Sequence, residues 1–291
     1  MSRLLTIVAL RTFGRGKHSA RMVTDWHPCG LLNNKPTQRY AIIILNQPVN
    51  KNALNAVIGS ASLLVCADGG ANRLYNYDKA ARNGMSKLKR RVPDAIVGDL
   101  DSLTESVGEH YRSLGSQVIK DPDQYSTDFT KCLKWIRDWA VSKLERGASG
   151  HGEEPQPIMD VVVLGGLGGR VDQGFSQVHH LFMAENHPEL LKGRIYLLSE
   201  QSLSFVLADG RNLIHLEPGY FAENVGILPV LGRTFLTTKG LEWDVEQWPT
   251  EFGGQVSTSN HIRSSEIDIA FEGPRPLFTL ELDNRLTATG E

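Results

Sequence analysis

Short, uninterrupted apolar runs alternate with amphipathic stretches up to about residue 200. Six of these runs have the length and composition of strands that are buried on both faces: residues 41–45, 62–67, 95–97, 117–119, 161–164 and 195–198. Continuous runs of this kind are typical of parallel strands whose sheet is covered by helices on both sides. Because helical patterns lie between the runs, we expect a mostly parallel α/β sheet.

The clearest helical pattern starts near Thr127. Its apolar residues recur at the spacing of one helix face: Phe129, Leu133, Ile136, Ala140 and Leu144. Ser126 and Thr127 carry the hydroxyl groups that N-cap positions favour. We therefore expect a long helix that begins next to Asp128.

The pattern of apolar and polar residues changes after about residue 200. The remaining segments are short, rich in β-forming residues and separated by Gly, Pro or Asn: residues 202–207, 212–216, 224–230, 234–237, 267–271 and 277–282. This pattern predicts a sandwich of short antiparallel strands. The expected fold class is therefore α/β, with a mostly parallel, Rossmann-like sheet domain at residues 25–200 and an all-β sandwich domain at residues 201–291.

Residues 1–24 are excluded from the expected fold. They carry five arginine or lysine residues and no acid before Asp25, the composition of a mitochondrial transit peptide. A disordered extension and an over-long gene model are the alternatives. We expect a cytoplasmic protein, with mitochondrial targeting by residues 1–24 as the second reading. Residues 82–91 and 143–157 lack periodicity and are expected to be surface loops.

Composition excludes several classes of partner. The 291 residues are 41% hydrophobic and 22% charged, which is enough for a sizeable core, and the net charge of −2 gives no reason to expect a nucleic-acid partner. No apolar run approaches the roughly 18 residues of a membrane span, so no membrane partner is expected. Three scattered cysteines are too few for a disulfide framework or a zinc site, and Cys66 and Cys132 are expected in the core.

Aspartates follow the predicted strands. Asp68 ends the second run, Asp99 and Asp101 follow the third, and Asp128 opens the long helix. Ligands of open α/β sheets bind at the carboxyl ends of the strands, so we expect one shared cleft. If residues 99–101 are extended, both carboxylates point to the same side and repel each other unless a cation lies between them. Their oxygens suit Mg²⁺, although aspartates after strands are also ordinary turn and cap residues.

A glycine-rich segment, Gly165-Gly-Leu-Gly-Gly-Arg-Val-Asp172, follows the fifth run and precedes an expected helix. Its backbone N–H groups could approach a phosphate, and Arg170 could add a charged fork. The dinucleotide fingerprint is incomplete because Val171 takes the place of its third glycine, which argues against an NAD-linked oxidoreductase. Walker A and protein-kinase signatures are absent. The segment therefore predicts a phosphate site of another kind.

Two other features have both a functional and a structural reading. His179 and His180 are adjacent on an expected helix and point in different directions, so we interpret them as structural. Trp243 could stack on a flat cationic heterocycle whose polar edge is held by the Ser- and Asn-containing residues 254–260. The alternative, which the local sequence favours, is a core aromatic followed by a turn.

Taken in order, these motifs resemble those of the thiamine pyrophosphokinases, particularly the eukaryotic type. The resemblance covers about residues 40–282 and is carried by several motifs: Leu45-Asn-Gln-Pro48, Ala67-Asp-Gly-Gly-Ala-Asn72, Gly98-Asp-Leu-Asp-Ser102, Ser126-Thr-Asp-Phe-Thr-Lys-Cys-Leu133, the 165–173 segment and Val256-Ser-Thr-Ser-Asn260. The basic extension and the 143–157 loop depart from the family pattern. Neither touches the motifs.

The resemblance implies a Mg²⁺-dependent transfer of the diphosphate of ATP to the hydroxyethyl oxygen of thiamine, which gives thiamine diphosphate and AMP. It implies in-line displacement in a homodimer, with thiamine between the α/β domain of one subunit and the β-sandwich of its partner. It also favours a place for Trp243 in the thiamine pocket over the reading as a core aromatic. A non-catalytic nucleotide or thiamine sensor is the remaining alternative, and the intact acidic set argues against it.

The resemblance also assigns residues to ligands. It assigns Mg²⁺ binding and catalysis to Asp99, Asp101 and Asp128. The ATP site takes Asp68, Thr127, Lys131, Gly165, Gly166, Gly168, Gly169, Arg170 and Asp172. The thiamine site takes Gln124, Trp243, Ser257 and Asn260. Asp99 and Asp128 both stay open as the general base, and Asp121 and Asp123 are expected to shape a turn.

Overall fold

The computed structural model describes residues 22–83, 92–145 and 159–287. Nearly all of the expected targeting segment, and most of the two expected loops at 82–91 and 143–157, lie outside these residues. The compartment of the protein therefore stays a prediction. Among the residues described, no helix has the combination of length and apolar character needed to cross a membrane.

The six predicted strands of the α/β unit are confirmed. They are β2 (Tyr40–Ile44), β3 (Leu63–Ala67), β4 (Ala95–Gly98), β5 (Gln117–Lys120), β6 (Asp160–Leu164) and β7 (Ile195–Leu198). They lie in the order β7-β6-β2-β3-β4-β5, and every neighbouring pair is parallel.

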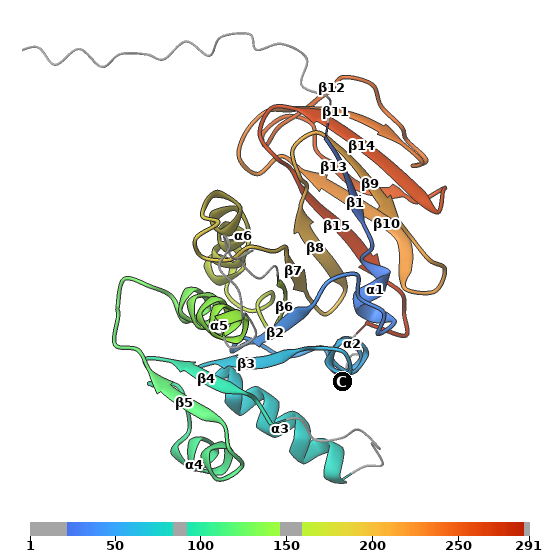
Figure 1. Ribbon diagram of the computed structural model, residues 1–291. Helices are drawn as coiled ribbons and strands as arrows, with labels where there is room; N and C mark the ends of the chain where they lie inside the picture. Colours follow the sequence, from blue (N-terminus) through green and yellow to red (C-terminus); the bar gives the residue numbers. More distant parts are fainter. Residues whose placement is uncertain (1–21, 84–91, 146–158, 288–291) are drawn as a thin grey trace, which may run out of the picture.

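Helices cover both faces of this parallel sheet, as the continuous apolar runs predicted (Figure 1). On one face lie α2 (Lys51–Ile58), α3 (Gly70–Asn83) and α4 (Glu105–Ser113), with the short α1 (Cys29–Leu32) against α2. On the other face lie α5 (Asp128–Glu145) and α6 (Val171–Asn186). Successive strand residues alternate between the two cores: Ile42 and Ile44 join the first core, and Ala41 and Ile43 join the second.

The sheet does not stop at the end of the α/β unit. Strand β8 (Ser202–Val206) lies antiparallel beside β7, and β15 (Leu277–Leu282), β10 (Phe221–Leu228) and β13 (Ser257–His261) continue the same sheet to ten strands. A second sheet of five strands packs on this antiparallel half: β1 (Val23–Trp26), β9 (Arg211–His215), β14 (Glu266–Glu272), β11 (Thr234–Lys239) and β12 (Trp248–Thr250). Phe205, Ile214, Leu236 and Phe278 lie in the core between them. The predicted α/β fold with an all-β sandwich is thereby confirmed.

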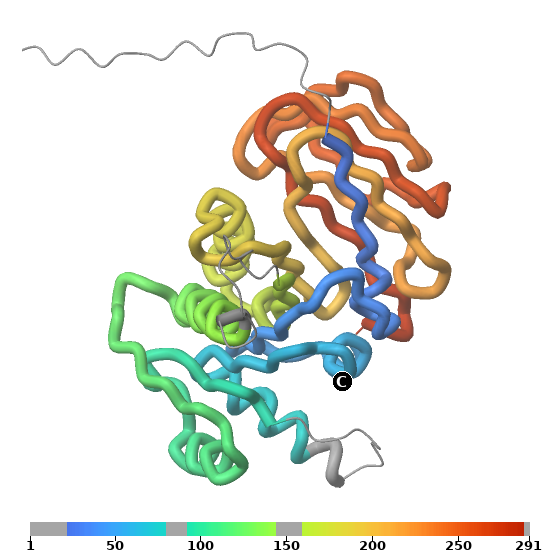
Figure 2. Tube along the Cα trace, viewed as in Figure 1, coloured from blue at the N-terminus to red at the C-terminus, as the bar shows by residue number. Residues whose placement is uncertain are grey.

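The first described strand belongs to the sandwich, although the chain then enters the α/β unit (Figure 2). Strand β1 pairs in parallel with β9. Trp26 anchors it, because its Nε1 donates to Asn212 Oδ1 at 2.9 Å and its ring stacks on Phe205 with centroids 4.4 Å apart. Residues 23–26, which the expected domain limits divide between the extension and the α/β domain, thus lie in the five-stranded sheet. The domain limits themselves stay a prediction.

Candidate active site

A large cavity lies where the strand order reverses. From β2 the chain moves outward through β3, β4 and β5, and then returns to β6 on the other side of β2. Such a reversal leaves a crevice outside the carboxyl ends of the strands. A cavity of about 560 Å³ occupies this place, and Asn46, Asp68, Asp128 and Gly166 are among the residues that line it. The expected shared cleft is therefore present.

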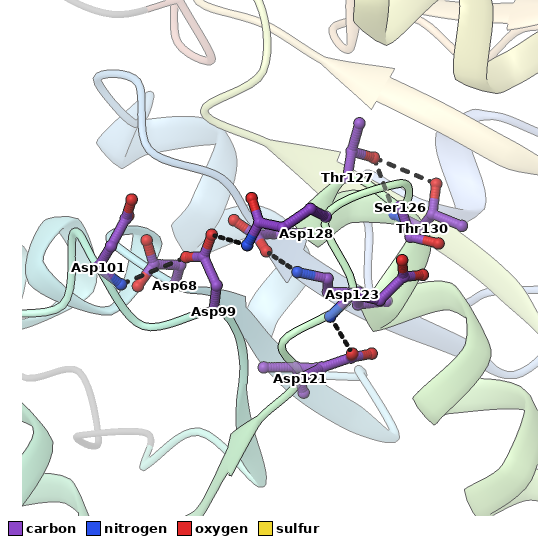
Figure 3. Close-up of polar contacts among 12 residues, drawn as sticks. Asp68, Asp99, Asp101, Asp121, Asp123, Ser126, Thr127, Asp128 and Thr130 are labelled. Carbon is purple, nitrogen blue, oxygen red and sulfur yellow. Dashed lines mark hydrogen bonds and ion pairs between the residues drawn. The ribbon is translucent and has the colours of Figure 1, made fainter.

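Three carboxylates converge in this cavity. Asp68 follows β3, Asp99 follows β4 and Asp128 begins α5; one oxygen atom of each lies within 4.8 Å of the others (Figure 3). The sheet brings the first two together because β3 and β4 are neighbours and Ala67 lies opposite Val97. The third comes from the N-terminus of the helix that covers both strands.

Asp68 is the buried member of this group. It is 4% exposed and adopts a left-handed φ of 42°. Its Oδ2 accepts the backbone N–H of Ser102 at 3.0 Å, whereas its buried Oδ1 has no hydrogen-bond donor among the described residues. Burial raises the pKa of the carboxyl group, the hydrogen bonds from Ser102 lower it, and the charge of Asp128 raises it further. An acceptor without a donor, inside a set of hard oxygen ligands, fits a divalent cation such as Mg²⁺.

Asp99 is held by its neighbours. Its Oδ1 accepts the N–H of Asp101 at 3.3 Å, and its Oδ2 accepts Nε2 of Gln124 at 3.4 Å. The bond from the Asp101 backbone has the largest effect and lowers the pKa of the Asp99 carboxyl group. Burial opposes it, the bond from Gln124 lowers the pKa further, and the net direction is downward. Gln124 thus lies at the acidic group, and its expected contact with thiamine stays a prediction.

Asp101 lies apart from the three grouped carboxylates. Its Oδ1 accepts the hydroxyl of Ser102 at 3.0 Å, and it lines the same cavity to the left of the group in Figure 3. The expectation that Asp99 and Asp101 share one side depended on an extended backbone. Leu100 instead has a φ of 65°, so that condition is not met. The structure joins Asp68, rather than Asp101, to Asp99 and Asp128, and the role of Asp101 stays a prediction.

The start of α5 carries a buried cation beside Asp128. Lys131 is 3% exposed, and its Nζ lies 3.1 Å from Asp128 Oδ1. Burial lowers the pKa of Lys131, but the hydrogen bond and charge of Asp128 outweigh it, and the net direction is upward. Thr127 caps the helix, because its Oγ1 accepts the N–H of Thr130 at 3.2 Å. This confirms the predicted cap and fixes the backbone next to Asp128.

His180 of α6 is tied to this cap. Its Nδ1 lies 2.5 Å from the Ser176 carbonyl oxygen and therefore carries the proton, so that Nε2 accepts the Thr127 hydroxyl at 2.7 Å. Burial lowers the pKa of this imidazole, which favours the neutral form. The structural reading of His180 is confirmed, and the residue also lines the cavity.

The glycine segment forms the turn between β6 and α6. Gly165, Gly168 and Gly169 have φ values of 69°, 116° and 71°. A Cβ at Gly165 would lie 2.6 Å from the Leu45 carbonyl oxygen, so this turn and the end of β2 can approach only because residue 165 is glycine.

Arg170 follows that turn and precedes α6 directly. It is exposed at the cavity and pairs with Asp172, with Nη2 and Oδ2 2.6 Å apart. The structure thus brings Gly165, Gly166 and Arg170 to the cavity. Asp172 is not among the lining residues, but it contacts Arg170, which is.

The remaining thiamine candidates lie in the β-sandwich. Trp243, Ser257 and Asn260 line a second hollow of about 180 Å³, which we call the sandwich hollow. Asn260 fixes the backbone of Trp243 by accepting its N–H at 3.1 Å and donating to its carbonyl at 3.0 Å. The indole is 55% exposed, so the core reading of Trp243 does not hold. The sandwich hollow shares no lining residue with the cavity that contains Gln124.

Several cavity residues received no role from the sequence. Asn46 and Gln47 follow β2, and their position at a strand end beside the reversal of strand order could have drawn attention to them. Gln173 and Gln177 lie on α6. No local pattern distinguishes these two glutamines from ordinary helix residues. Asp121 and Asp123 accept backbone N–H groups two residues ahead, at 3.0 and 2.9 Å, as predicted for a turn.

Comparison with known proteins gives one consistent result. The family model for "Thiamin pyrophosphokinase, catalytic domain" matches residues 54–191, and the model for "Thiamin pyrophosphokinase, vitamin B1 binding domain" matches residues 211–275. The chain is 31% identical over 270 residues to a thiamine pyrophosphokinase of Saccharomyces cerevisiae, covering 80% of this chain and 82% of the relative. It is 32% identical over 237 residues to thiamine pyrophosphokinase 1 of Arabidopsis thaliana, covering 79% and 82%.

Solved structures agree with this assignment. A thiamin pyrophosphokinase from Candida albicans superposes with a TM-score of 0.75 at 26% identity and covers 91% of this chain and 95% of its own. The yeast enzyme superposes with a TM-score of 0.76 at 26% identity and covers 92% and 95%. The acidic group and the sandwich hollow fall within the two matched regions. The chain belongs to the thiamine pyrophosphokinase family.

Proposed function

We propose that this protein transfers the β,γ-diphosphate of ATP to the hydroxyethyl oxygen of thiamine in a Mg²⁺-dependent, in-line displacement. Membership of the family supports the conversion of thiamine to thiamine diphosphate with ATP as co-substrate. The observation that carries the finer proposal is the group formed by Asp68, Asp99 and Asp128 in the same cavity as the glycine turn before α6. Hard oxygen ligands and a phosphate cradle together suit a metal-bound triphosphate.

Asp68, Asp99 and Asp128 would hold the cation, with Asp101 at the edge of the same cavity completing the set. When bound, Mg²⁺ supplies positive charge to the phosphate oxygens of ATP and helps to orient them. Lys131 keeps the Asp128 carboxylate in place through its 3.1 Å contact. The cap by Thr127 also fixes the backbone next to Asp128, and the bond from Gln124 limits the motion of Asp99.

The glycine turn and Arg170 would bind the triphosphate. Backbone N–H groups at the start of α6 would bind a phosphate, because the dipole of a helix favours an anion at its N-terminus. Arg170 is exposed at the cavity, and its partner among the described residues is Asp172, so its guanidinium can exchange the carboxylate for a phosphate.

The bond changes balance without a further reactant. The thiamine hydroxyl oxygen forms a bond to the β-phosphorus while the bond from that phosphorus to the bridging oxygen of the α-phosphate breaks. AMP leaves with that oxygen, and the hydroxyl proton is released. Transfer of this kind depends mainly on positioning and charge neutralisation, which rigid strand-end and helix-start residues provide.

We propose that thiamine binds between two subunits of a homodimer. Gln124 lies at the acidic group, whereas Trp243, Ser257 and Asn260 line the separate sandwich hollow. An indole that is 55% exposed offers its face to a partner or ligand, and such a face attracts a flat cation such as the thiazolium ring. The cavity of one subunit and the sandwich hollow of its partner would then form one thiamine site.

The test compares two aspartates on the same helix. Asp128→Asn should lower kcat by at least about tenfold and raise the Mg²⁺ concentration that gives half-maximal rate, because a ligand is lost. Asp138→Asn is the matched control, since Asp138 is exposed on α5 and pairs only with Arg137 in the described residues. Unchanged turnover and Mg²⁺ dependence in a folded Asp128→Asn protein would overturn the metal assignment.

A further inference from the structure

Gln177 presents an unused hydrogen-bond acceptor in the cavity. It lies about two turns into α6, is 8% exposed and lines the cavity beside Gly166. Its Oε1 is buried and has no hydrogen-bond partner among the described residues. Burying an amide oxygen without a donor costs free energy, so such an atom in a binding cavity points to a donor on the ligand.

Both ring nitrogens of the neighbouring His180 already have partners. The Nδ1–H of His180 faces the Ser176 carbonyl oxygen, and its Nε2 accepts the Thr127 hydroxyl. Gln177 itself packs against the glycine turn, because a Cβ at Gly166 would lie 3.2 Å from both Gln177 Cγ and Leu45 Cδ1. The amide therefore lies beside the glycine turn, and a molecule in the cavity can supply the donor that no described residue supplies.

The chemistry of the acceptor selects one part of the nucleotide. A carbonyl oxygen repels phosphate oxygens, so Oε1 does not serve the triphosphate itself. The group attached directly to the triphosphate is the ribose, whose hydroxyls are hydrogen-bond donors. We propose that Gln177 Oε1 accepts a hydrogen bond from a ribose hydroxyl and makes the protein selective for ribonucleotides over deoxyribonucleotides. This rests on the proposed function only in that ATP occupies the cavity.

The test measures kcat/KM for nucleotide with thiamine and Mg²⁺. ATP, 2′-deoxyATP, 3′-deoxyATP and inosine triphosphate are compared in the wild type and in Gln177→Met, which keeps the length of the side chain but removes the acceptor. The wild type should prefer ATP over one deoxy analogue by about 5- to 100-fold, because the analogue leaves Oε1 unpaired. In Gln177→Met this preference should fall below about threefold, while the ratio of ATP to inosine triphosphate stays unchanged.

Two further variants make the result specific. Gln177→Glu retains an acceptor oxygen and should keep the ribose preference even if its rate with ATP falls. Gln117→Met changes an exposed glutamine on the edge strand β5 and should behave as the wild type. If thermal melting shows that Gln177→Met does not fold, Gln177→Asn, which withdraws the amide by one methylene, is measured with the same expectation.

Three results would overturn the inference: a wild type that uses ATP and both deoxy analogues equally, a Gln177→Met protein that keeps the preference, or a Gln177→Met protein that changes only the ratio of ATP to inosine triphosphate. The last would move the contact to the base. Failure of the proposed function is distinct, because the wild type would then form no thiamine diphosphate from any of these nucleotides.

Discussion

Gly98, the last residue of β4, lies next to Asp68 and Asp128 of the acidic group. A Cβ at this position would lie 2.8 Å from Asp68 Cβ and 3.1 Å from Asp128 Oδ1. The first distance is shorter than any ordinary carbon contact, so one of the two aspartates would have to move. Absence of a side chain at residue 98 therefore lets the carboxylates of β3 and α5 approach each other.

We expect Gly98→Ala to lower kcat at least about tenfold and to raise the Mg²⁺ requirement, because displacing ligands by a fraction of an ångström impairs a positioned transfer. Steady-state rates over a Mg²⁺ titration measure both effects. Gly174→Ala is the control: its Cβ would meet nothing closer than Leu167 Cδ2 at 4.0 Å, and alanine inside α6 should add about 0.5–1 kcal/mol of stability. Full activity of Gly98→Ala at limiting Mg²⁺ would contradict this reading.

Sequence reasoning at this scale identified the aspartates but not their grouping. Spacing along the chain favoured Asp99 with Asp101, whereas Asp68 joins the group because β3 and β4 are neighbours. Strand order cannot be read from local pattern, and neither can the left-handed conformation of Leu100. Trp243 shows the same limit: its sequence surroundings favoured a core residue, and its exposure depends on how the sandwich folds.

At the scale of elements, α5 and α6 are joined by the bond between His180 and the cap residue Thr127. α5 begins with Asp128, and α6 follows the glycine turn. The bond therefore connects the helix that carries a proposed metal ligand to the helix that carries the proposed phosphate site. It requires neutral His180, whose Nε2 is then the acceptor.

This bond predicts a pH dependence of stability. Burial lowers the pKa of His180 in the folded protein below its ordinary value of about 6.5. As the pH falls, the imidazole of the unfolded chain therefore takes up a proton before that of the folded protein does. The stabilisation is complete above about pH 6.5 and is lost as pH falls from there toward the lower folded pKa. Urea unfolding at several pH values measures it.

His180→Gln should lose this part of the pH dependence, whereas His179→Gln, which changes the exposed neighbour, should retain it. Persistence of the wild-type slope in His180→Gln would assign the effect to another group. His179 enters as the nearby charge that lowers the pKa of His180 slightly, which is why it is the appropriate comparison.

Prediction of elements succeeded where burial was strong and failed at some sheet edges. The buried strands β2, β3 and β6 are apolar throughout. Strands β12 and β13 were not predicted, because β12 contains Pro249 and β13 is the polar segment Ser257–His261. Both lie at the edge of a sheet, where a strand needs only one partner and tolerates proline and polar residues.

On the scale of the whole molecule, one ten-stranded sheet runs through both units of the chain (Figure 1). The sequence predicted the two units but not their continuity, which depends on the antiparallel pairing of β8 with β7. A shared sheet and a shared core hold the units in one arrangement. The cavity with Gln124 and the sandwich hollow with Trp243 are therefore separate features of each chain.

This separation predicts complementation between subunits. In a mixture of Asp128→Asn and Trp243→Ala chains, half of the dimers are mixed and one of their two sites is intact, so activity should recover to about a quarter of the wild-type value. Assays on co-expressed, differently tagged chains measure it. Asp128→Asn mixed with Asp99→Asn should show no recovery, because both changes affect the same cavity. Absence of recovery in proven mixed dimers would contradict the shared thiamine site.

The fate of the β-phosphorus of ATP distinguishes diphosphate transfer from transfer of a single phosphoryl group. The protein is incubated with thiamine, Mg²⁺ and ATP that carries a radioactive β-phosphorus, and the products are separated. We predict that the label appears in thiamine diphosphate and that unlabelled AMP forms in equal amount. Labelled ADP together with thiamine monophosphate would show transfer of the γ-phosphoryl group alone and rule out diphosphate transfer.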